Sequence, residues 1–273
     1  MAPSYTQRRN IMEDTLSRVE IILHEVPEGS LESTFISKQL PSLPPIPETE
    51  RTSARVRVVN CDAFTLAREI MNRTEAAKGR TAVLNLASDL YRAGGWTQTL
   101  SVTQEEALCY SSTLYHTLKE EYYPWPNMGP TSIAGVYSAA VVIFKDDLDH
   151  DCEDLPANER RTVAILTVAA PRSPPLSEDG ETLRWEKDLD CFREKIRLVY
   201  RMAAHNGKDY VVLGAMGCGA YECPPRQVAE EMKAILLEEE FRGRFQEIAF
   251  AVYSTPRNRN YEVFKEVLDG VEV

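Results

Sequence analysis

Hydrophobic positions follow two alternating patterns along most of this 273-residue chain. Short apolar runs rich in valine and isoleucine are typical of buried strands, and they predict strands at 55–59, 81–87, 135–144, 163–169, 210–213 and 248–253. Apolar residues at helical spacing predict helices at 5–25, 62–72, 105–121, 186–204, from 225 onward and at 261–268. Strands that alternate with helices predict an α/β protein with a mixed or parallel sheet.

The first 53 residues depart from this alternation. An amphipathic helix at 5–25 is followed by a stretch, 26–53, that contains prolines at 27, 41, 44, 45 and 47. Such a stretch predicts an extended connection without a fold of its own. We therefore expect residues 1–53 to pack as a helix and a proline-rich connection on one functional domain, residues 54–273. The acidic stretch 146–160 has no clear period and is expected to be a loop, whose role the sequence leaves open.

Charge and cysteine usage narrow the functional classes. The formal net charge of −11 argues against non-specific binding to nucleic acid or to an anionic membrane, because the summed charge repels both. Six cysteines form no CxxC pair and four histidines form no HExxH motif, so a zinc site is not expected. The scattered cysteines suit a reducing compartment. With no apolar signal core and no run of about 18 apolar residues, we expect an intracellular, soluble protein.

Two glycine-containing loops each lie between a predicted strand and a predicted helix. Gly94-Gly95 follows the strand at 81–87, and Gly214, Gly217 and Gly219 follow the strand at 210–213. Because strand ends in such sheets meet at one crevice, we expect both loops at one site. The second loop offers backbone N–H groups that suit a phosphate, and a merely tight turn explains it equally well. It is neither a Walker A loop nor a dinucleotide fingerprint.

Candidate acid–base residues stand at the predicted helix start after the first loop. Glu105 and Glu106 are adjacent carboxylates suited to proton transfer. The alternative interpretation is structural, because Thr103 and Glu106 have the spacing of a capping box. Cys218 has the position of a nucleophile whose pKa falls at a helix start, but no histidine partner can be assigned to it, which favours a small buried residue. Arg92 is suited either to a phosphate contact or to solvent.

The order of these motifs carries a resemblance to a known family. The matching runs are Leu84-Asn85-Leu86-Ala87-Ser88, Ala93-Gly94-Gly95-Trp96, Gln104-Glu105-Glu106-Ala107-Leu108-Cys109 and Leu213-Gly214-Ala215-Met216-Gly217-Cys218-Gly219. In this order they resemble the bacterial, or microbial-type, poly(ADP-ribose) glycohydrolases of the macrodomain superfamily, over roughly residues 5–268. The resemblance implies a three-layer α/β/α macrodomain with a mixed central sheet and an N-terminal helical extension.

The resemblance also implies a reaction. Glu106 matches the catalytic glutamate, which would protonate the leaving oxygen of the ribose–ribose glycosidic bond and then activate water. Glu105 matches the neighbour that holds the terminal ribose, and no metal or cofactor is needed. The other implied substrate-binding residues come from one strand end, the two loops and the helix start: Asn85, Ala93, Gly94, Gly95, Trp96, Gln104, Gly214, Gly217, Cys218, Gly219, Ala220 and Tyr221.

The chain departs from the family at the first glycine loop. The family usually reads Asn-Pro-Gly-Gly-Gly, whereas this chain reads Tyr91-Arg92-Ala93-Gly94-Gly95; an alternative register places Trp96 at the third glycine. Three interpretations therefore stay open: a hydrolase that releases ADP-ribose from poly(ADP-ribose), a hydrolase of a different ADP-ribosyl linkage, and a non-catalytic reader. The expected partners are ADP-ribose, its polymer or ADP-ribosylated proteins. A monomer in the cytoplasm or nucleus is expected.

Overall fold

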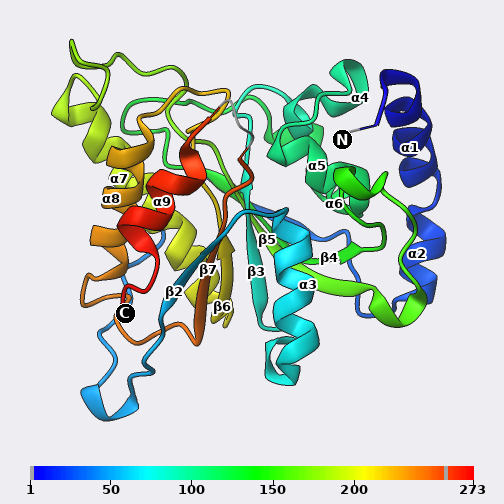
Figure 1. Ribbon diagram of the computed structural model, residues 1–273, viewed down its shortest axis with the longest axis horizontal. Helices are drawn as coiled ribbons and strands as arrows, with labels where there is room; N and C mark the ends of the chain where they lie inside the picture. Colours follow the sequence, from blue (N-terminus) through cyan, green and yellow to red (C-terminus); the bar gives the residue numbers. More distant parts are fainter. Residues whose placement is uncertain (1–2, 255–257) are drawn as a thin grey trace.

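The computed structural model describes residues 3–254 and 258–273, which build one mixed sheet with helices on both faces (Figure 1). The strands are β1 Ser33–Ile36, β2 Val56–Val59, β3 Thr81–Leu86, β4 Gly135–Ile143, β5 Arg161–Val168, β6 Tyr210–Leu213 and β7 Glu247–Ala251. Their order across the sheet is β1-β4-β5-β3-β6-β7-β2. Strands β5, β3, β6, β7 and β2 run parallel, while β4 is antiparallel to both β1 and β5.

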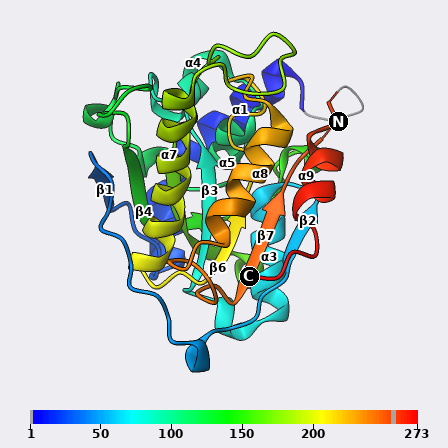
Figure 2. The same ribbon diagram turned by 90° about the vertical axis from the view of Figure 1, so that its left-hand side faces the viewer.

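The helices form two layers. They are α1 Tyr5–Ser17, α2 Val19–Glu25, α3 Ala63–Arg73, α4 Trp96–Thr99, α5 Gln104–Ser111, α6 Leu114–Thr117, α7 Glu186–His205, α8 Pro225–Leu236 and α9 Asn260–Leu268. Short 3₁₀ helices are η1 Glu48–Glu50, η2 Glu75–Ala77, η3 Arg92–Gly95, η4 Glu120–Tyr122, η5 Leu148–His150 and η6 Ala157–Glu159. Helices α7, α8 and α9 cover one face of the sheet, and α3, α5 and α1 lie on the other (Figures 1 and 2).

Alternation along the strands explains the two layers. In β3, Leu84 packs into the core under α7 and α8, whereas Val83 packs into the core under α3 and α5. In β5, Leu166 likewise packs into the core under α7 and α8, and Ile165 packs into the core under α3 and α5. Because successive side chains of a strand point to opposite faces, a strand that is apolar throughout requires helices on both sides. The three-layer α/β/α class with a mixed sheet is thereby confirmed.

The N-terminal 53 residues contribute more than a connection. Strand β1 lies within the proline-rich stretch, where the sequence analysis expected no strand, and pairs antiparallel with β4 at the sheet edge (Figure 2). The hydroxyl of Thr15 in α1 donates to the carbonyl of Tyr110 in α5 at 2.8 Å. Residues 39–41 hydrogen-bond to α7 and so hold this part of the segment against the helix. The domain boundary at residue 53 stays a prediction.

The prediction of one helix over 105–121 is wrong, since α5 ends at Ser111. The hydroxyl of Ser112 donates to the carbonyl of Leu108 at 2.7 Å, and the backbone N–H of Thr113 donates to Val142 of β4. Serine and threonine hydroxyls compete in this way with helical backbone bonds. The chain therefore turns toward β4 and resumes as the short helix α6. In the described part of the chain, no helix is long and apolar enough to cross a membrane.

Candidate active site

A cavity of about 840 Å³ opens where β2, β3, β6 and β7 end. Its wall includes Glu105 and Glu106, together with Gly94 of the first glycine loop and Gly217 and Gly219 of the second. The expectation that both loops share one site is therefore confirmed. The cavity lies at the carboxyl ends of parallel strands, which is the usual position of ligand sites in α/β sheets.

Gln104 fixes the start of α5 against the end of β3. Strand β6 pairs with β3 only as far as Val83, and beyond that point the side-chain amide of Gln104 takes its place. Its Nε2 donates to the carbonyl of Leu84 at 2.8 Å, and its Oε1 accepts from the N–H of Leu86 at 2.8 Å. Gln104 thus satisfies two backbone groups that the diverging strand leaves open, and it places the next two residues at the cavity.

Glu105 is held from behind by the strand end. Its Oε1 accepts from Nδ2 of Asn85 at 3.0 Å, and its Oε2 accepts from the N–H of Ser88 at 2.8 Å. Asn85 is fully buried and also donates to Oγ1 of Thr167, its partner in β5. Asn85 therefore lies behind the cavity wall and orients Glu105. Burial raises the pKa of Glu105 to about 8, although its two hydrogen bonds favour the ionised form.

Glu106 lies beside Gly94 and is 4% exposed. The hydroxyl of Thr103 donates to its Oε2. A Cβ added to Gly94 would overlap with Oε1 of Glu106 and lie 3.3 Å from Oε2 of Glu105, so both carboxylates converge on the space that this glycine leaves free. Burial raises the pKa of Glu106 too, which favours the protonated form of its carboxyl group.

The capping box expected from Thr103 and Glu106 is not formed. The Thr103 side chain accepts no capping hydrogen bond from the N–H groups of α5, and its hydroxyl donates to the Glu106 carboxylate. In a capping box the same hydroxyl would accept from the third helical residue. The structural interpretation of this pair is therefore wrong, and Thr103 orients the carboxylate of Glu106.

The first glycine loop turns through three successive left-handed residues. The φ angles are +52° at Ala93, +62° at Gly94 and +77° at Gly95. Ala93 and Trp96 are fully buried and do not line the cavity; the Trp96 ring packs edge-on against Tyr110, with centroids 5.2 Å apart. Among these residues the loop brings only Gly94 to the cavity wall, and the others position it.

Arg92 is anchored away from the cavity. Its guanidinium carbon lies 3.8 Å from the ring centroid of Tyr115, and its Nε and Nη2 donate to the carbonyl of the same residue at 3.2 and 2.7 Å. With these contacts, Arg92 neither extends into solvent nor lines the cavity. It is therefore neither a solvated residue nor a phosphate contact, the two interpretations drawn from the sequence, and its role is structural. The arginine fixes the loop on α6.

The second glycine loop runs from Gly214 to Pro224, and α8 begins only at Pro225. Within this loop, the N–H groups of Gly217, Gly219, Ala220 and Tyr221 have no acceptor among the described residues. They are donors from the loop itself, as the sequence analysis expected, and they precede the start of α8. Such a row of free N–H groups suits an anionic ligand.

Cys218 and Gly214 lie behind the cavity wall. The thiol of Cys218 donates to the carbonyl of Met216 at 3.7 Å, and burial raises its pKa well above the ordinary value. A thiol in this state is inert, so Cys218 is not a nucleophile. A Cβ on Gly214 would be 3.4 Å from Leu86, which makes this glycine a packing contact between β3 and β6.

Asp89 is a site residue that the sequence analysis missed. It is fully buried, and its carboxylate accepts from Nδ2 of Asn127 at 3.0 Å, from the hydroxyl of Tyr221 at 2.9 Å and from Nη2 of Arg172 at 3.0 Å. Asn127 also donates to the carbonyl of Ala170 at 2.8 Å. The carboxylate thereby joins the first glycine loop to the second and to the chain after β5. The donors are 38 to 132 positions away in sequence, so no local signal marks Asp89.

We expect Asp89→Asn to lower the free energy of unfolding by about 1–3 kcal/mol, because a side-chain amide would turn an N–H group toward buried donors. The change in the urea midpoint measures this loss. Asp151→Asn, at an exposed position, is the matched control and should stay within about 0.5 kcal/mol of wild type. Equal stability of the two variants would show that Asp89 does not join the loops.

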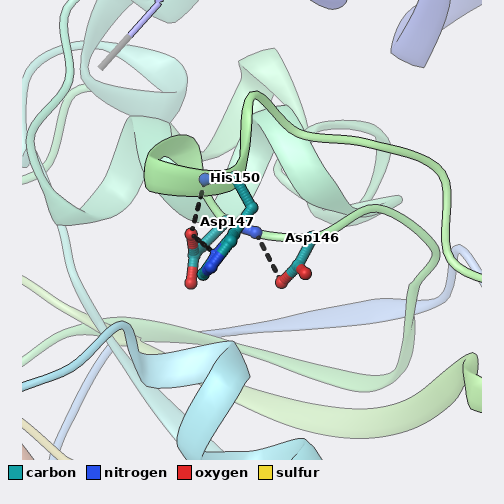
Figure 3. Close-up of side chains that lie close together, drawn as sticks. All are labelled: Asp146, Asp147 and His150. Carbon is teal, nitrogen blue, oxygen red and sulfur yellow. Dashed lines mark hydrogen bonds and ion pairs between the residues drawn. The ribbon is translucent and has the colours of Figure 1, made fainter. Parts of the chain in front are cut away.

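One grouping in the described chain has the composition of a cation site: Asp146, Asp147 and His150, in the acidic loop (Figure 3). Its oxygens already have donors. Asp147 Oδ1 accepts from the N–H groups of Asp149 and His150 and from the His150 ring, and Asp146 Oδ1 accepts from Arg68 at 2.7 Å. The grouping is explained as the cap of η5 and an ion pair with α3.

Comparison with known proteins agrees with this geometry. The family described as the catalytic domain of microbial-type poly(ADP-ribose) glycohydrolase (PARG) matches residues 18–146. No curated protein sequence matches the chain. Among solved structures, PARG from Thermomonospora curvata is 26% identical, with 95% of this chain and 98% of that chain covered and a TM-score of 0.76. PARG from Deinococcus radiodurans in complex with ADP-ribose is 30% identical, with 79% and 84% covered and a TM-score of 0.66.

A further structure of the Thermomonospora protein holds the inhibitor ADP-HPD and is 27% identical to this chain. With 30% identity over 84% of the Deinococcus protein, and with the predicted motifs gathered around one cavity, the resemblance drawn from the sequence is confirmed. The chain belongs to the microbial-type poly(ADP-ribose) glycohydrolases.

Proposed function

We propose that this chain hydrolyses poly(ADP-ribose) at the ribose–ribose glycosidic bond and releases ADP-ribose. The observation that carries the proposal is the pair of buried carboxylates, Glu105 and Glu106, that converge on the gap left by Gly94. Cleavage of a glycosidic bond passes through an oxocarbenium-like centre, which nearby carboxylates stabilise. The relatives solved with ADP-ribose and with ADP-HPD support ADP-ribose as the ligand of this cavity.

Glu106 is proposed as the acid and base. Burial raises its pKa and so favours the protonated form, which in the proposed first step donates its proton to the leaving ribose oxygen. The resulting carboxylate then accepts a proton from the attacking water. Thr103 holds one oxygen of Glu106, which leaves the other beside Gly94 to face the substrate. Glu105, fixed by Asn85 and Ser88, is proposed to hold the terminal ribose.

The diphosphate is proposed to bind the second glycine loop. The free N–H groups of Gly217, Gly219, Ala220 and Tyr221 supply donors without requiring a net positive charge, which this acidic chain lacks. No metal takes part in the proposed steps. The intracellular location and the monomeric state expected from the sequence stay predictions.

The test is incubation of the pure protein with poly(ADP-ribose), with released ADP-ribose identified by mass, beside calorimetric titration of free ADP-ribose. Release together with binding is the expected result. Binding without release would favour a reader or a hydrolase of another ADP-ribosyl linkage, because the cavity would then recognise the ligand without cutting this bond. If the protein shows no binding of ADP-ribose and no release of ADP-ribose from the polymer, the proposal is overturned.

Gly217→Ala should raise the Kd for ADP-ribose about tenfold or more. At this position φ is +79°, and a Cβ would lie 2.6 Å from Cβ of Ala170 and 2.7 Å from Sγ of Cys223, so the loop must move. Calorimetry measures the change. Gly270→Ala is the matched control: its φ is +78°, but a Cβ there meets nothing within 4 Å, so it shares the backbone strain and should keep wild-type affinity. If both variants bind alike, the second glycine loop is not the diphosphate site.

A further inference from the structure

One residue that departs from the family pattern, Tyr91, is bonded through its backbone to two residues of the cavity wall. Tyr91, where the family usually has asparagine, is 64% exposed. Its N–H donates to the hydroxyl oxygen of Ser88, a cavity residue, at 3.2 Å, and its carbonyl accepts from the N–H of Gly94 at 3.1 Å. Gly94 in turn touches Glu106. Tyr91 is thus an exposed aromatic side chain whose backbone is tied to the catalytic end of the cavity.

The altered loop is held in place and not left loose. Arg92, next to Tyr91, is stacked on Tyr115 and bonded to its carbonyl. On the other side, the N–H of Leu90 donates to Ser88 at 3.2 Å. An aromatic side chain on a fixed backbone loses little conformational freedom when a flat ligand stacks on it, and this favours affinity.

A cation is bonded to the same segment of chain as Tyr91. Arg172 bonds to Asp89 through Nη2, and Asp89 is two residues from Tyr91. The Arg172 side chain is 41% exposed, and its Nε and Nη1 have no acceptor among the described residues. The guanidinium therefore keeps donors for a phosphate. In a chain with a net charge of −11, a local cation favours the approach of a polyanion.

We propose that Tyr91 and Arg172 form a second subsite, which binds the ADP-ribose unit on the leaving side of the scissile bond. This inference rests on the proposed function. The adenine of that unit stacks on the Tyr91 ring, and its diphosphate pairs with Arg172. The leaving oxygen that Glu106 protonates belongs to this unit, so we place the rest of the unit on the Gly94 side of the cavity, where the backbone of Tyr91 bonds to Ser88 and Gly94.

The experiment compares two ligands on one protein. In a Glu106→Gln background, which keeps the polymer intact, calorimetry measures the Kd of ADP-ribose and of a two-unit ADP-ribose oligomer. We expect the oligomer to bind about tenfold more tightly than the single unit. Tyr91→Ala should remove this advantage and leave the Kd of ADP-ribose unchanged, because stacking is lost only in the second subsite. Tyr91→Phe, which keeps the ring, should restore it.

Two further variants sharpen the test. Trp185→Ala removes an aromatic residue that is 45% exposed and whose carbonyl accepts from Asp188 and Leu189 of α7, not from a cavity residue, so it should preserve the oligomer advantage. Arg172→Gln removes the cation while Asp89 keeps its bonds to Asn127 and Tyr221, so it should lower the advantage several-fold in protein whose melting temperature shows that it is folded.

The proposal is overturned if wild-type Tyr91 gives the oligomer no advantage, or if Tyr91→Ala leaves the advantage intact. It is also overturned if Tyr91→Ala weakens ADP-ribose to the same extent as the oligomer, since Tyr91 would then belong to the first subsite. The ratio of the two Kd values does not depend on turnover. A failure of the subsite is therefore distinguishable from a failure of the proposed function. The proposed function fails if the unmodified chain releases no ADP-ribose from the polymer.

Discussion

Glu106→Gln is expected to lower kcat for poly(ADP-ribose) by about 10³-fold or more while the Kd for ADP-ribose stays within about threefold. The amide has the shape of the carboxyl group and can still accept from Thr103, so the cavity keeps its form. It cannot give a proton to the leaving oxygen, and it cannot take one from water. Loss of turnover with retained affinity is the signature of a group that acts in the transition state.

The measurement is initial-rate release of ADP-ribose, with calorimetry on the same preparation. Glu121→Gln is the matched control, because it removes one carboxylate of the same type at an exposed position outside the cavity, and it should turn over at the wild-type rate. If Glu106→Gln hydrolyses as fast as wild type, the acid is another group. Glu105, whose pKa burial raises to about 8, would then be the next candidate.

Much of this site could be predicted from local sequence. Strand β3 is apolar on both faces, the polar Asn85 interrupts it near its end, and Gly94 and the two glutamates follow at short distance. Such signals need only neighbouring residues, since burial on both faces and positive φ angles are local requirements. The convergence of the two glycine loops also followed, because parallel strands bring their carboxyl ends to one edge.

What could not be predicted depends on distant partners. Strand β1 lies among prolines, and its strand conformation is stabilised by pairing with β4 about a hundred residues later. Asp89 looks like a surface residue in sequence and is buried only because Asn127, Arg172 and Tyr221 supply donors. Spacing alone also misassigned Thr103, since a hydroxyl can either cap a helix or donate to a carboxylate.

The altered residue of the first glycine loop lies away from the cavity, which explains why the cavity stays open. In the register that aligns Ala93 with the family's first glycine, Ala93 adopts a φ of +52°, which costs about 1–2 kcal/mol for a residue with a Cβ. Its methyl group points into the core with Trp96 and not into the cavity. The departure therefore falls on a residue behind the wall, whereas the position that touches both glutamates is still glycine.

Gly94→Ala should lower kcat about 100-fold and leave the fold intact. A Cβ at this position overlaps with Oε1 of Glu106, the free end of a side chain, so the carboxylate can move aside and the backbone can stay. A displacement of about 1 Å at a reacting group costs on the order of 10²-fold in rate. The effect should appear in kcat more than in the Kd for ADP-ribose, because the second glycine loop is untouched.

The neighbouring glycine provides the control. Gly95 has a φ of +77°, and a Cβ there would meet its nearest atoms, in Gln98 and Thr99, at 3.7 Å, an ordinary contact. Gly95→Ala therefore carries the same backbone strain of about 1–2 kcal/mol without touching Glu106. It should lose stability to the same extent as Gly94→Ala in a urea titration but keep kcat within about threefold of wild type. Equal rates in the two variants would mean that the gap at Gly94 does not set the position of the acid, since only one of the two methyl groups reaches it.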